Sequence, residues 1–66
     1  MDIILNGETH AARDGATLQE LVESLGLEGS RLAVELDGVI IRRPHWAETV
    51  LSPGAKVEIV HFVGGG

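Results

Sequence analysis

The sequence ends in HFVGGG, where three glycines directly follow an apolar segment. Glycine loses more backbone entropy on ordering than any other residue, so we expect residues 64–66 to form a flexible tail in the free protein. Fully extended, three residues reach roughly 10 Å, and without Cβ atoms they fit a channel too narrow for any side chain. The tail would then present the C-terminal α-carboxylate of Gly66 to another protein.

A carboxylate is ionised at neutral pH and is a poor electrophile, so the Gly66 carboxylate needs activation before it reacts. Adenylation by ATP would give a mixed anhydride that sulfur or nitrogen nucleophiles attack. The sequence has neither a GxxxxGK[ST] phosphate-binding loop nor clustered acidic residues suited to Mg²⁺. We therefore expect a partner enzyme to use ATP and Mg²⁺, and this chain to bind no cofactor. An inert frayed end or a cloning remnant is the alternative interpretation of the glycines.

The other residue types that carry chemistry favour structural roles. The sequence has no cysteine, which excludes disulfides, thiolate metal sites and a nucleophilic thiol. Its three histidines lack a metal-ligand spacing such as HExxH, so we predict no metal site. Trp46 is expected to pack against the core, and Arg42 and Arg43 to form a solvated pair.

Size and charge limit the domain count and the partners. Sixty-six residues suffice for one domain, which we place at 1–63 with the tail at 64–66. The start MDIILNGE lacks the features of a signal peptide, and no apolar run approaches the roughly 18 residues of a membrane span, so a cytoplasmic location without a membrane partner is expected. The net charge is −5, and residues 1–30 hold six acidic and one basic side chain. This charge argues against nucleic acid and suits a basic protein partner.

Local patterns predict an α+β fold. Asn6-Gly7 and Asp37-Gly38 each favour a tight turn between two antiparallel strands. Between the two hairpins, the capping-box spacing of Thr17 and Glu20 begins an amphipathic helix that ends at Gly26. Its apolar stripe consists of Leu18, Leu21, Val22 and Leu25. With a helical turn after Pro44 and a last strand over 56–63, the order predicts a mixed sheet of four to five strands with one main helix packed on one face.

The last strand is apolar on both faces near its end. Val57 and Ile59 point to one side, whereas Val60 and Phe62 point to the other. A central strand covered on both faces is one explanation. One short helix cannot cover two faces of a sheet, however, so we predict that Val60 and Phe62 lie on an open face and bind a partner.

Several segments together resemble the ThiS family, the sulfur carriers of thiamine biosynthesis. They are MDIILNGE, TLQELVESLGL, AVELDGVIIRR, PHWAETVL and IVHFVGGG. The resemblance covers essentially the whole chain, its last segment is the most specific, and it implies the ubiquitin-like β-grasp fold. The family usually ends in Gly-Gly, whereas this chain has three glycines.

The resemblance implies a protein co-substrate rather than an enzyme. A ubiquitin-activating-type adenylyltransferase would adenylate Gly66, sulfur from a cysteine desulfurase would convert it to a thiocarboxylate, and thiazole synthase would consume that sulfur. Gly64 and Gly65 would thread the partner's channel, and Val60 and Phe62 would dock. The small subunit of molybdopterin synthase, another β-grasp sulfur carrier, a lysine-conjugating ubiquitin-like modifier and a plain ligand-binding module remain as alternatives.

Overall fold

The computed structural model describes residues 1–28 and 31–62. Within these ranges the chain forms five strands, one α-helix and one 3₁₀ helix, in the order that the sequence predicts. Their bounds are β1 Asp2–Leu5, β2 Glu8–Ala11, α1 Leu18–Ser24, β3 Leu32–Leu36, β4 Val39–Ile41, η1 Arg43–Glu48 and β5 Lys56–His61.

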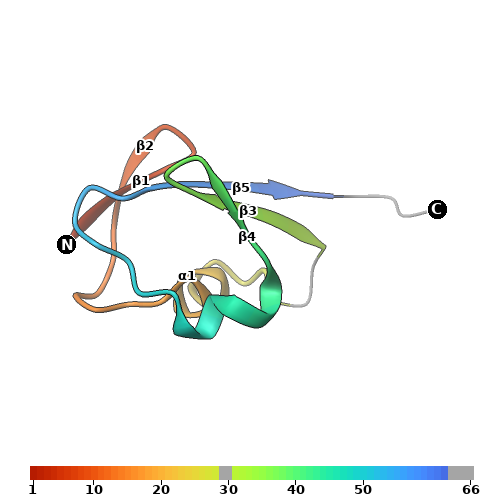
Figure 1. The fold of residues 1–66 in the computed structure, drawn as a ribbon. Coiled ribbons are helices and arrows are strands. Elements are labelled where there is room, and N and C mark those ends of the chain that lie inside the picture. Colours follow the sequence, from red (N-terminus) through yellow and green to blue (C-terminus); the bar gives the residue numbers. More distant parts are fainter. Residues whose placement is uncertain (29–30, 63–66) are drawn as a thin grey trace.

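The strands form one mixed sheet in the order β2-β1-β5-β3-β4. β1 runs parallel to β5, and the other neighbouring pairs are antiparallel. Figure 1 shows α1 and the teal η1 segment on the same side of the sheet, with no described element over its other face. The predicted α+β architecture is confirmed, and β5 is its central strand.

Both hairpins turn as the sequence predicts. At Asn6-Gly7 the φ angles are +49° and +83°, and at Asp37-Gly38 they are +49° and +86°. Positive φ at both central residues is the requirement of a type I′ turn, which Asn-Gly and Asp-Gly meet at low cost. These turns fix the registers of the β1–β2 and β3–β4 pairs.

One hydrophobic core lies between the sheet and the two helices. Its buried members are Ile3, Leu18, Leu21, Val22, Val34, Trp46, Leu51, Ala55, Val57 and Ile59. The predicted packing role of Trp46 is confirmed, since it is 1 % exposed and its indole N–H donates to the Ile41 carbonyl at 2.8 Å. The Arg43 guanidinium lies 4.6 Å from the Trp46 ring centroid, so Arg43 packs on this ring. The prediction of a solvated pair is therefore wrong for Arg43.

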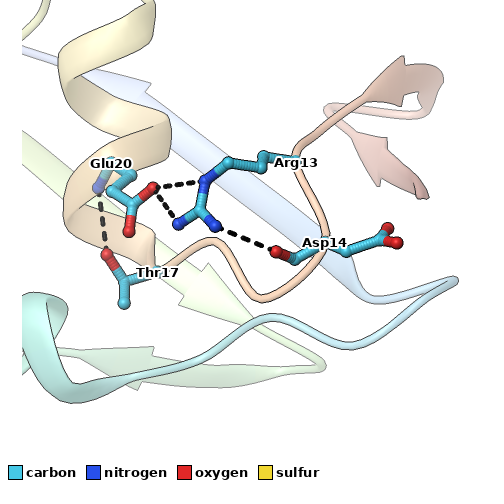
Figure 2. Close-up of polar contacts among 4 residues, drawn as sticks. All are labelled: Arg13, Asp14, Thr17 and Glu20. Atoms are coloured by element: carbon cyan, nitrogen blue, oxygen red, sulfur yellow. Dashed lines mark hydrogen bonds and ion pairs between the residues drawn. The ribbon is translucent and has the colours of Figure 1, made fainter.

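The N-terminus of α1 forms half of the predicted capping box (Figure 2). The Thr17 hydroxyl accepts a hydrogen bond from the Glu20 N–H at 3.1 Å. The Glu20 carboxylate instead accepts hydrogen bonds from Arg13, at 2.6 Å from Nη2 and 3.2 Å from Nε. Arg13 also donates to the carbonyl of Asp14 at 3.1 Å. Because the Arg13–Glu20 pair is exposed, it contributes about 1 kcal/mol at most.

Candidate functional site

The two faces of β5 differ sharply in exposure. Val57 and Ile59 are 0 % and 9 % exposed and lie in the core, whereas Val60 and Phe62 are 54 % and 55 % exposed. Phe62 follows the last residue of β5, His61, so the strand ends before the predicted limit at residue 63. The predicted alternation is confirmed, and the alternative of a strand covered on both faces is wrong for the described residues. The role of Val60 and Phe62 in binding a partner stays a prediction.

The sheet register also places apolar residues of β3 and β4 on this face. Ala33 on β3 pairs with Val60, and Ile40 on β4 pairs with Glu35. Directly paired residues point to the same face of a sheet, so Ile40, which is 68 % exposed, lies on the same side as Val60. We call Ala33, Ile40, Val60 and Phe62 the outer patch.

Sequence reasoning missed Ala33 and Ile40. The alternation of β3 gave a signal for Ala33, because its neighbours Leu32 and Val34 face the core side. Ile40 gave none, since it lies in the uniform run Val39–Ile41. Only the register with β3 assigns the face of Ile40.

The end of β5 is held by contacts from two other parts of the chain. On one side, the Asn6 side chain accepts from the Ile59 N–H at 2.8 Å and donates to the Ile59 carbonyl at 3.3 Å. On the other side, β3 pairs with β5 as far as His61, and the Phe62 N–H donates to the Arg31 carbonyl at 3.0 Å. The Asn6 amide takes the place of a strand partner where β1 has ended. These contacts hold the segment that carries Val60 and Phe62 of the outer patch.

The predicted tail chemistry falls on residues outside the described ranges. Gly64, Gly65 and Gly66 belong to this group, as does Val63, the last residue of the predicted strand. Phe62 is therefore the last residue that the structure describes.

The described residues offer no metal site. No group of three or more His, Asp or Glu in 1–28 and 31–62 is arranged to hold a metal ion. His10 lies on β2 and His61 on β5, whereas His45 lies on η1 with its Nδ1 atom 2.6 Å from the Glu48 carboxylate. Across the same ranges, none of the helices has the length and apolar character needed to cross a membrane.

Comparison with known protein families shows the family of this chain. The model of the ThiS family matches residues 3–66, which is nearly the whole sequence. The chain belongs to the ThiS family. The match includes the outer patch and the terminal glycines, so it covers every residue that the sequence singles out for chemistry.

The relatives of this ThiS-family chain include proteins of about its own length and much longer thiazole synthases. The sulfur carrier protein ThiS of Bacillus subtilis is 40 % identical over 63 residues, which cover 94 % of this chain and 96 % of that protein. The thiazole synthase of Magnetococcus marinus is 41 % identical over 66 residues, which cover all of this chain but 20 % of that protein. This chain thus spans about a fifth of the length of the thiazole synthases it matches.

A solved ThiS structure has the same fold. The crystal structure of the thiamine biosynthesis protein ThiS from Geobacter metallireducens superposes with a TM-score of 0.84 at 28 % identity, and each chain is covered completely. With a five-stranded mixed sheet and one main helix on one face, this chain has the ubiquitin-like β-grasp fold that the resemblance implies.

Proposed function

We propose that this chain carries sulfur as a thiocarboxylate on Gly66 and donates it to formation of the thiazole ring of thiamine. The observation that carries the proposal is the family match, which runs through the terminal glycines. A relative of nearly equal length that is named a sulfur carrier protein supports it. Sulfur loading in this form requires a free carboxylate on Gly66.

The chemistry on Gly66 has two steps. In the first, a carboxylate oxygen attacks the α-phosphorus of ATP, pyrophosphate leaves, and an acyl adenylate forms. In the second, a desulfurase forms a persulfide from cysteine, and a thiol reductant releases its outer sulfur as a hydrosulfide equivalent. This sulfur attacks the carbonyl carbon, AMP leaves, and a thiocarboxylate remains. The chain acts as a co-substrate in both steps, and a ubiquitin-activating-type adenylyltransferase supplies the ATP site and Mg²⁺.

The outer patch provides the docking surface in this scheme. Ile40, Val60 and Phe62 are each more than half exposed on one face of the sheet. Exposed apolar side chains grouped on one face beside polar residues are typical of a protein interaction site. Because Val60 and Phe62 of this surface come shortly before residues 64–66 in the sequence, an enzyme bound to it is well placed to receive the glycines.

Thiazole synthase is the proposed acceptor of the sulfur. Two proteins named thiazole synthase contain a segment that matches this chain from end to end. A carrier segment within the chain of a synthase supports a direct functional pairing between the two. We propose that the same pairing occurs here between this chain and a thiazole synthase.

Incubation of the sulfur-loaded chain with thiazole synthase and the other substrates of that enzyme tests the proposed acceptor. We expect intact mass spectrometry to show the thiocarboxylate returning to a carboxylate, because the sulfur is transferred to the substrate of the synthase and water hydrolyses the Gly66 acyl group. The loaded chain without synthase is the control. A thiocarboxylate that persists with synthase, but is consumed by molybdopterin synthase, would contradict the thiazole step. Isopeptide adducts on lysine would instead indicate a protein modifier.

A further inference from the structure

Two glutamates directly face each other on the open side of the sheet. Glu35 on β3 pairs with Glu58 on β5, and directly paired residues point to the same face. Like charges in this arrangement repel and destabilise the sheet. Neither carboxylate forms an ion pair within the described part of the chain, where the pairs are Met1–Asp14, Arg13–Glu20 and His45–Glu48.

The glutamate pair borders the outer patch. Along β5, Val60 follows Glu58 on the same face, and along β3, Ala33 precedes Glu35 on that face. Same-face neighbours on one strand are about 7 Å apart, so a single partner surface covers both groups. Ile40 pairs with Glu35 and completes the row at the β4 edge.

The surface beyond the glutamates is also acidic. Three acidic residues and one lysine line one hollow on this surface. They are Glu35, Asp37, Glu58 and Lys56. The Asp37 carboxylate already accepts a hydrogen bond from the Lys56 N–H at 2.9 Å, whereas the two glutamates face each other across the strands. The row of Glu35 and Glu58 therefore has an excess of negative charge, with Ile40 at its β4 end and the Ala33–Val60 pair beside it.

We infer that the Glu35–Glu58 pair receives an arginine or lysine side chain of the adenylating enzyme while the apolar side chains of that enzyme cover the outer patch. This inference rests on the proposed function. A basic side chain between the two carboxylates removes their repulsion and forms charge-assisted hydrogen bonds. The repulsion is a cost in the free chain and a source of affinity and orientation in the complex.

Charge complementarity favours the adenylating enzyme as the occupant. An enzyme that binds the triphosphate of ATP lines its site with cationic groups, and the potential at the entrance of such a site is positive. Two carboxylates without an internal partner, at the edge of an apolar docking surface, complement that potential. A bound divalent cation does not fit as well, because calcium and magnesium require about six oxygen ligands and the described residues provide no such group.

Neutral isosteres test the inference. In the double variant Glu35→Gln/Glu58→Gln, we expect the Kd for the adenylating enzyme to rise about tenfold at low salt. The melting temperature should rise by about 2–5 °C, because the cross-strand repulsion is lost. The matched control is Glu23→Gln/Glu28→Gln, which changes the net charge equally at two exposed positions away from this face and should alter the Kd less than about twofold.

The outcomes separate this inference from the function on which it rests. An unchanged Kd in Glu35→Gln/Glu58→Gln, with adenylation intact, overturns the inference and leaves the sulfur carrier standing. Weaker binding to thiazole synthase alone overturns the choice of the adenylating enzyme. A dimer of the free chain that the double variant disrupts assigns the pair to a second copy and also overturns it. A wild-type chain that the enzyme does not adenylate overturns both proposals.

Discussion

Replacing Gly65 by valine is expected to reduce adenylation of Gly66 by more than about 100-fold, since even small displacements of a reacting group cost this much. Valine adds a branched side chain at Cβ, which would obstruct a channel that accepts only glycine and would keep the carboxylate from the α-phosphorus of ATP. The measurement is ATP–pyrophosphate exchange with the cognate adenylating enzyme. Thermal unfolding of the variant should match that of the wild type, because Gly65 comes after every core residue of the described chain in the sequence.

Two further variants control the valine result. Gly65→Ala adds a single methyl group, so its exchange rate should lie between those of wild type and Gly65→Val. Deletion of Gly65 and Gly66 should abolish exchange completely while the chain still folds. A normal exchange rate in Gly65→Val would contradict a narrow channel and weaken the case for the glycines as a threading segment.

Phe62→Ala is expected to weaken binding to the adenylating enzyme by about 2 kcal/mol, or about thirtyfold in Kd, which is typical of an aromatic residue at the centre of an interface. The ring is 55 % exposed, so its removal should cost the free chain less than about 1 kcal/mol of folding free energy. Isothermal titration measures the first effect and thermal unfolding the second. A core aromatic would behave in the opposite way, with a loss of about 3–5 kcal/mol in stability.

A matched pair of valines controls for exposure. Val60 and Val50 are 54 % and 59 % exposed, but Val60 lies in the outer patch whereas Val50 pairs with Thr17 beside the N-terminus of α1. Val60→Ala should weaken binding, and Val50→Ala should leave the Kd unchanged. Equal effects of the two substitutions, or a large fall in stability of Phe62→Ala, would contradict docking through the outer patch.

Much of the fold could be predicted because its signals are local. The Asn6-Gly7 and Asp37-Gly38 dipeptides determine their own turn type, and the 3.6-residue spacing of apolar residues determines which face of α1 is buried. The exposure of Val60 and Phe62 also followed, from simple alternation along β5 and from the presence of only one main helix. The turn and helix inferences each need information from fewer than about ten neighbouring residues, whereas the exposure of Val60 and Phe62 also needs the number of helices in the whole sequence.

The remaining features depend on pairings between distant residues. The Asn6 side chain bonds the Ile59 backbone, 53 positions away, although the sequence marks Asn6 only as a turn residue. Similarly, Glu35 and Glu58 are unremarkable until the β3–β5 register places them opposite each other. The capping-box spacing predicted a contact of Glu20 with its own helix end, but the nearby Arg13 guanidinium is a stronger donor for that carboxylate. The Asn6–Ile59 and Glu35–Glu58 partners are far apart in the sequence, so local pattern holds no information about them. The Arg13–Glu20 contact is local, but the capping-box spacing considers only Thr17 and Glu20.

Intact mass spectrometry tests the central claim most directly. The chain is incubated with ATP, Mg²⁺, the adenylating enzyme and a sulfur source, and is then treated with a thiol alkylator. Because the sequence lacks cysteine, an added alkyl group reports the thiocarboxylate. Alkylation also excludes oxidation of Met1, which gives nearly the same mass change as replacing oxygen by sulfur. We predict one alkyl group, localised to Gly66 by fragmentation. An unmodified chain, in a reaction where the enzyme loads another carrier, would contradict the assignment of this chain as a sulfur carrier.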